Sequence, residues 1–230
     1  MKHLRVTWPA IALAVAATSM VSGEAAASNE IGLSATYDAR MPLGSFRSSI
    51  KEASFGGLQA KWDFFPVDFL ATGLEVQYNL FQRGQTTDTV TTSDAAITGT
   101  TFRYASFWSL IPTVRYYMFA RDTIRPYAEL GAGVTSVTSA VLISDQSQRN
   151  ISTAFILQPS LGVMVRLTPD RRGREMAEQE REVGVGVLRE PLESMIGLTA
   201  SVTYAYTTAD VLASNNVQYA GFQVGIYAKP

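Results

Sequence analysis

The 230-residue sequence has no cysteine and a single histidine, His3. The lack of cysteine excludes disulfides, thiolate metal sites and thiol catalysis. Histidine is the usual general base near neutral pH, and His3 lies in an N-terminal segment that we expect to be cut away. The sequence therefore predicts a protein that is not an enzyme and that uses no metal and no cofactor.

An excess of one charge is also lacking, since 19 Lys and Arg residues face 20 Asp and Glu residues. A nucleic-acid partner is not expected, because binding to phosphates needs a basic surface. Beyond the N-terminal segment, no apolar run reaches the ~20 residues that a membrane-spanning helix requires. A helical membrane protein is excluded on this ground.

Residues 1–27 have the features of a secretory signal peptide. Lys2 and Arg5 precede the apolar stretch VTWPAIALAVAATSMVS, and the small residues AAA at 25–27 suit a cleavage site. An N-terminal membrane anchor is the alternative, although Pro9 interrupts the stretch and the stretch is shorter than a spanning helix. We expect one mature domain over residues 28–230.

Apolar and polar residues alternate along most of that domain. In residues 195–207, Ile196, Leu198 and Val202 fall on one face, whereas Thr199, Ser201 and Thr203 fall on the other. The same period predicts eight strands. They cover residues 30–38, 54–64, 69–81, 101–119, 125–140, 152–168, 194–208 and 217–228.

Most of these strands are long enough to cross a bilayer at a tilt, which takes about nine to eleven residues. Short connections at 65–68 and 120–124 alternate with longer polar ones. The longer ones cover 39–53, 82–100, 141–151 and 209–216. This alternation predicts a barrel with a periplasmic rim of tight turns and an exterior rim of loops.

The less apolar face carries Gly, Ser, Thr and Gln with few ionisable side chains, which suits a narrow polar lumen, while the apolar face suits lipid. The ionisable set comprises Lys61, Asp63, Glu75, Arg103, Arg115, Glu129 and Arg166. Aromatic residues near the strand ends predict two interfacial girdles. One comprises Trp62, Phe64, Phe65, Phe69, Tyr116 and Phe119, and the other Tyr37, Tyr78, Tyr204 and Tyr206. A soluble barrel or sandwich remains the alternative.

The segments WDFFPVDFLATGLEVQY at 62–78 and RYYMFARDTIRPYAELGAGV at 115–134 resemble the strand, tight turn and strand units of small Gram-negative outer-membrane β-barrel proteins, the OmpA/OmpX-like group. This resemblance implies an all-β fold, an eight-stranded antiparallel up-and-down transmembrane β-barrel in the bacterial outer membrane, with both termini on the periplasmic side. The charged stretch 169–193 departs from the pattern, because a tight turn is expected there. It is either a docking element for a periplasmic partner or a tolerated insertion.

The expected strand register indicates a role for the ionisable residues of the lumen face. If the turn ARDTI brings Phe119 opposite Arg125, then Arg115 lies opposite Glu129, and the turn FPVD brings Lys61 within a diagonal step of Glu75. We expect a lumen ion-pair network that rigidifies and plugs the barrel, with Arg166 on the same face. An acid and base pair of Glu75 and Glu129 is the weaker interpretation.

The predicted function is non-enzymatic: a structural or surface-recognition role through the exterior loops, with outer-membrane lipids and a surface ligand as partners and a monomer as the expected state. A narrow channel or porin for small or hydrophobic solutes is the alternative. We expect a mobile exterior loop at Gln85–Thr101 and solvated cations in the first loop, where Arg40, Arg47 and Lys51 could meet anionic headgroups.

Overall fold

The computed structural model describes residues 30–67, 69–91, 96–119, 123–143, 146–168, 195–212 and 214–229. The predicted signal peptide at 1–27 and the charged insertion at 169–193 lie outside these residues. Among the described residues, no helix has the length and apolar character needed to cross a bilayer.

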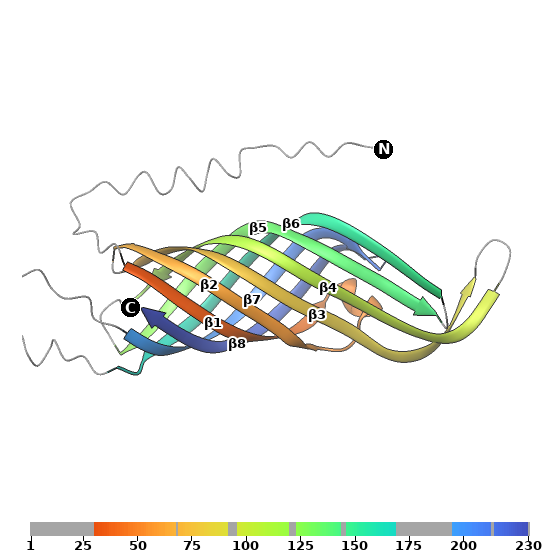
Figure 1. Ribbon diagram of the computed structural model, residues 1–230, viewed down its shortest axis with the longest axis horizontal. Coiled ribbons are helices and arrows are strands. Elements are labelled where there is room, and N and C mark those ends of the chain that lie inside the picture. The colour runs from red at the N-terminus through yellow and green to blue at the C-terminus, as the bar shows by residue number, and fades with distance from the viewer. Residues whose placement is uncertain are drawn as a thin grey trace, which may run out of the picture.

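Eight antiparallel strands form one closed barrel in sequence order, and β1 pairs with β8 to complete it. Figure 1 shows this up-and-down arrangement, with the start of β1 and the end of β8 at the same end of the barrel. The strands are β1 (Glu30–Leu43), β2 (Ser54–Val67), β3 (Leu70–Thr91), β4 (Ala96–Tyr117), β5 (Ile124–Ile143), β6 (Gln146–Arg166), β7 (Met195–Val211) and β8 (Ser214–Lys229). The predicted fold class and strand order are confirmed.

The predicted alternation separates two faces of the wall. On β7, Ile196, Leu198 and Val202 are exposed, whereas Thr199 and Ser201 are buried. Because successive side chains of a strand point to opposite sides of a sheet, one set faces outward and the other faces the lumen.

The expected long exterior loops are mostly strand. β3 runs to Thr91 and β4 begins at Ala96, while β5 ends at Ile143 and β6 begins at Gln146. The expectation of a loop at Gln85–Thr101 was therefore wrong wherever this segment is described, and so was the loop expected at 209–216, since β7 reaches Val211 and β8 starts at Ser214. The Thr-rich composition that suggested a loop also suits a strand, because threonine is β-branched.

The first connection is the exception. β1 continues to Leu43, and the chain then forms a single helical turn, α2 (Phe46–Ser49), before β2 begins at Ser54. α2 turns back toward the barrel mouth. Phe46, its first residue, and Ile50, which follows its last residue, are fully buried.

Strand length divides the barrel into two halves. β3, β4, β5 and β6 have 22, 22, 20 and 21 residues, whereas β1, β2, β7 and β8 have 14, 14, 17 and 16. The four long strands extend past the others at the end opposite the termini, where the β3–β4 hairpin reaches furthest in Figure 1. We call this four-stranded extension the projecting sheet.

Candidate functional site: the filled lumen and the apolar wall

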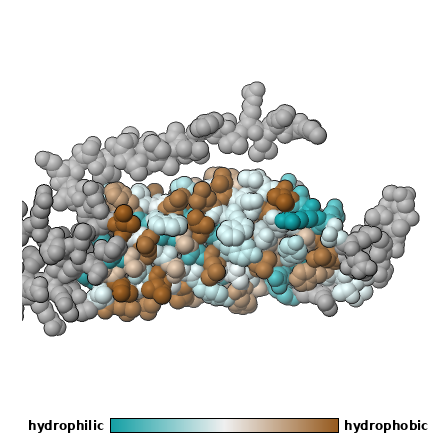
Figure 2. All heavy atoms as spheres, in the orientation of Figure 1, coloured by the Kyte–Doolittle hydropathy of each residue, from teal (hydrophilic) through white to brown (hydrophobic). Residues whose placement is uncertain are grey.

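The outward face of the wall is apolar around the barrel. Its exposed side chains include Leu33, Leu58, Leu74, Leu110, Val114, Leu130, Val134, Leu161, Leu198, Val202, Val224 and Ile226. Figure 2 shows apolar residues spread over the visible wall, with more hydrophilic residues toward the end of the projecting sheet. Such a surface is unfavourable in water and suits hydrocarbon, so the chain is built as a membrane-spanning barrel.

Aromatic side chains mark two levels of this wall. Near the turn end, Phe69 contacts Tyr116 with ring centroids 6.0 Å apart; further along, Tyr78 contacts Trp108 at 4.8 Å. From Tyr116 to Trp108 the wall rises about 20 Å, at roughly 3.3 Å per residue and a strand tilt near 40°. This spacing is close to the height of about 25 Å for the apolar band of outer-membrane barrels.

The residues predicted for the girdles lie on the outward face, with one exception. Trp62, Phe64, Phe69, Tyr116 and Tyr204 are exposed, and Tyr206 is half-buried. Phe65 was placed wrongly in the girdle, because it points into the lumen and is 3% exposed. Phe64 takes the outward position there, as strand alternation requires.

Inside the barrel, Glu129 binds two cations through one oxygen. Its Oε2 accepts hydrogen bonds from Lys61 Nζ and, at 2.6 Å, from Arg115 Nε. Arg115 also donates to Asp63 at 3.1 Å and to the Tyr117 hydroxyl at 2.9 Å. Buried charges are tolerated when they are paired in this way.

The register places these residues much as the turns predict. Arg115 lies opposite Glu129, as expected. Lys61 lies directly opposite Glu75 and not on a diagonal, yet its ion pairs are with Glu129 and, at 3.7 Å, with Asp63. Glu75 accepts a hydrogen bond from Gln158 at 2.9 Å.

Arg166 was also expected in this network. It lies on β6 opposite Gly197 of β7 and is half-buried, whereas Lys61, Arg115 and Glu129 are buried.

Sequence reasoning missed a second charged group higher in the lumen. Arg40 donates to Asp38 at 2.5 Å and to Gln158 at 3.3 Å, and Gln77 donates to Asp38 at 3.0 Å. Arg40 is 1% exposed, so its assignment to a solvated loop was wrong. The alternation of Thr36, Asp38 and Arg40 on one face of β1 was the available signal. We call Asp38, Arg40, Lys61, Asp63, Glu75, Arg115 and Glu129 the ionic layer.

Apolar residues close the lumen below the ionic layer. At the turn end, Phe65 stacks on Tyr117 with centroids 6.0 Å apart, and Tyr117 meets Tyr127 edge-on at 5.7 Å. Arg115 lies 4.5 Å from the centroid of the Tyr127 ring, which joins this aromatic floor to the ionic layer.

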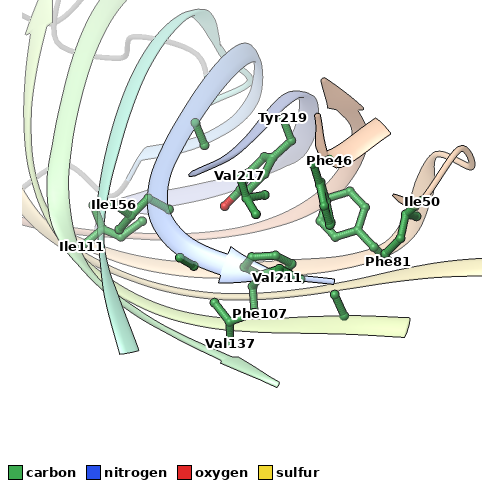
Figure 3. Packing of buried hydrophobic residues seen from close by; sticks show 13 residues of the cluster. Phe46, Ile50, Phe81, Phe107, Ile111, Val137, Ile156, Val211, Val217 and Tyr219 are labelled. Atoms are coloured by element: carbon green, nitrogen blue, oxygen red, sulfur yellow. The ribbon is translucent and has the colours of Figure 1, made fainter. Parts of the chain in front are cut away.

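Above the ionic layer, most of the buried side chains are apolar, whereas a narrow polar lumen was expected. Asn79 and Thr207 are buried polar residues at this level, opposite Phe107 and Val217. Figure 3 shows the side chains of this outer apolar layer packed together. Its members include Phe46, Ile50, Phe81, Phe107, Ile111, Val137, Ile156, Val211, Val217 and Tyr219, all buried. Tyr219 connects the two layers, because its ring lies 4.5 Å from the Arg40 guanidinium.

This arrangement fills the lumen with three kinds of contact along its length: aromatic floor, ionic layer and outer apolar layer. In the middle, Arg40 is paired with Asp38, and Lys61 and Arg115 are paired with Asp63 and Glu129. Within the described ranges, no group of three or more Asp, Glu, His or Cys side chains could hold a metal ion.

No protein-family model matches the sequence, and no curated protein matches it either. Similar solved structures are small barrels. Neisserial surface protein A is 15% identical, with a TM-score of 0.48 over 88% of this chain and 98% of its own. OprG from Pseudomonas aeruginosa is 12% identical, with a TM-score of 0.47 over 89% and 97%. Ail of Yersinia pestis, solved with the heparin analogue sucrose octasulfate, is 11% identical, with a TM-score of 0.43 over 87% and 97%. At these values the likeness concerns the fold and says nothing of activity.

Proposed function

We propose that the chain is a non-enzymatic outer-membrane β-barrel that recognises a partner at the cell surface through its projecting sheet. The observation that carries this proposal is the length of β3 to β6 beyond the aromatic level of Tyr78 and Trp108. From Asn79 to Thr91, β3 rises about 30 Å further at the same tilt. The sheet therefore stands in water, where a partner could reach it.

The edge of β6 gives the sheet a means of recognition. β6 pairs with β5 as far as Gln146, whereas its ladder with β7 begins only at Ile156, opposite Thr207. The side chains of residues 147–150 are exposed on both faces of the strand. A strand edge of this kind can accept an extended peptide as an additional strand.

The direction of the backbone groups follows from one hydrogen bond. The N–H of Phe155 points to the β7 side, because it donates to the Thr208 hydroxyl at 3.2 Å. Alternate residues of a strand point their backbone groups to the same side, so Thr153, Ile151 and Arg149 offer N–H and C=O groups at the edge. Arg149 adds a positive charge, which favours a peptide with an acidic side chain.

The absence of histidine after His3 supports a non-enzymatic role, because a general base that works near neutral pH would have to be a residue other than histidine.

The filled lumen supports a closed barrel over the alternative of a channel, because eight strands leave room only for side chains. Planar-bilayer recordings of the purified barrel test this point. A steady open conductance in most insertions would favour the channel.

Surface recognition is tested with a phage-displayed library of random peptides panned on the barrel in nanodiscs. Binding of the enriched peptides should fall at least tenfold in Arg149→Pro and in Ile151→Pro, because proline removes an N–H at the edge and leaves the ladder with β5 intact. Arg149→Gln is the matched control, since it keeps the N–H and removes only the charge. Folding of each variant is checked by its shift in gel mobility on heating. If no peptide is enriched, or if the proline variants bind as before, the edge is not the recognition surface.

A further inference from the structure

The connection between β1 and β2 is amphipathic and places its apolar side inside the barrel. Phe46, Ser49 and Ile50 are buried, whereas Arg47, Ser48, Lys51 and Glu52 are exposed. Positions i, i+3 and i+4 share one face of a helical turn, so one turn is enough to separate the two kinds of side chain. The turn is entered at Gly44, whose φ of +56° lies in the left-handed region that glycine adopts readily.

Phe46 is held by aromatic rings from the barrel wall. Its ring lies edge-on to Phe81 at 5.3 Å and to Phe107 at 6.0 Å. Phe81 and Phe107 in turn contact Tyr219 at 5.6 and 5.8 Å. Figure 3 shows Phe46 and Ile50 near these side chains, which come from β3, β4 and β8. The wall therefore forms an aromatic socket that an element of the chain's own first connection fills.

The polar attachment of α2 is slight by comparison. Ser49 donates to the Leu212 carbonyl at 3.0 Å, Ser214 donates to the Ser45 carbonyl at 3.1 Å, and the two hydroxyls lie 3.3 Å apart. The turn has no side-chain hydrogen bond at its N-cap. Each strand of the wall, in contrast, is paired with at least one neighbouring strand along most of its length. Local opening begins in segments that have few backbone partners of this kind.

We propose that α2, with the side chains of Phe46 and Ile50, is a detachable plug that opens and closes the outward mouth of the lumen. In the closed form the plug fills the aromatic socket of Phe81, Phe107 and Tyr219. When the plug leaves, water and small solutes reach the outer apolar layer, and the ionic layer beneath it still limits passage through the barrel. This inference is independent of recognition at the β6 edge.

A cysteine reporter tests the plug, and the chain offers a clean background because it has no cysteine. Ile111 is fully buried and lies four positions from Phe107 toward the turn end of β4, so a thiol there reports access to the lumen beneath the plug. The rate at which Ile111→Cys reacts with a water-soluble methanethiosulfonate is measured by mass spectrometry. Combining it with Phe46→Ser should raise the rate at least tenfold, whereas Arg47→Ser, on the exposed side of the same turn, should leave it unchanged.

A reversible lock separates a detachable plug from a fixed cap. The 3.3 Å between the hydroxyls of Ser49 and Ser214 suits a disulfide in the Ser49→Cys, Ser214→Cys variant. Oxidation should lower the labelling rate at position 111 at least fivefold below that of the unlocked protein, and reduction should restore it. The lock tests the native turn without disturbing Phe46, so it does not depend on the folding of the Phe46→Ser variant. The proposal is overturned if neither the disulfide nor Phe46→Ser changes the labelling rate. It is also overturned if Phe46→Ser raises the rate but the disulfide does not lower it.

Discussion

The ionic layer and the outer apolar layer occupy neighbouring levels of one lumen and are built on different chemistry. Glu129, Arg115 and Lys61 depend on a small number of directional contacts, each between charges. Phe81, Phe107 and Tyr219 depend on shape and on many weak contacts. Loss of one partner should therefore be severe in the ionic layer and graded by volume in the apolar layer.

The two layers also differ in how they are covered. Residues of the wall itself enclose the ionic layer, and its charges lie between the aromatic floor and Tyr219. The outer apolar layer includes Phe46 and Ile50 of a connection, so part of its packing comes from an element outside the sheet. Stability and access are consequently expected to separate: the ionic layer governs the first, and the plug governs the second.

The largest effect is expected when one partner of the ionic layer is removed. Glu129→Gln or Arg115→Met alone should lower the free energy of unfolding by about 3 to 5 kcal/mol, because an uncompensated charge stays buried, and the double variant should lose much less than the sum. Urea unfolding in detergent micelles measures the three variants. Additive losses would mean that the two side chains do not interact, and the contrast between the layers would fail.

The next effect concerns the outward face of the barrel wall. The two lumen layers can be compared in this way only if that face contacts lipid. Val202→Arg should destabilise the barrel by about 2 to 4 kcal/mol if Val202 lies near the bilayer midplane. Val202 is 61% exposed and its neighbour Thr203 is buried. Folding into lipid vesicles at increasing urea concentrations measures the loss, and Thr208→Arg, which is also outward but further from the turns, is the matched control. Equal and small losses at both positions would argue for a soluble barrel.

The sequence predicts much of the ionic layer and little of the apolar one, for a physical reason. Alternation identifies inward positions when the two faces differ in polarity, and a tight turn then fixes which residues meet, as for Arg115 and Glu129. Around Phe107 the run FWSLI is apolar on both faces, so Trp108 and Leu110 point outward while Phe107 and Ile111 point inward without a visible signal. The position of Phe46 depends on a turn that folds back on distant strands, which no local pattern encodes.

In the outer apolar layer, the loss is expected to follow the volume that a substitution removes, and the smallest truncation should have a smaller effect than Val202→Arg. Ile156 is fully buried there, and Ile156→Val should cost about 0.5 to 1.5 kcal/mol, since one methylene is lost and the cavity is small. Ile156→Ala should cost about 2 to 5 kcal/mol, in proportion to the larger cavity. Urea unfolding of both variants measures whether the loss follows volume. Equal losses for valine and alanine would show that this layer behaves like the ionic one.

The smallest effect is expected at Arg47 and Lys51, two cations that are close in sequence to Arg40. Arg47 and Lys51 are exposed, so Arg47→Ala and Lys51→Ala should change the free energy of unfolding by no more than about 0.5 kcal/mol. Arg40 belongs to the ionic layer, where its guanidinium binds Asp38 and lies over Tyr219, so Arg40→Met should show a loss of the size expected for Arg115→Met. The three variants are compared by urea unfolding at 0.1 M and 1 M salt. Because salt screens exposed charges more than buried ones, the loss in Arg40→Met should be nearly the same at both salt concentrations. A loss in Arg47→Ala as large as that in Arg40→Met would contradict the prediction that burial distinguishes these two cations.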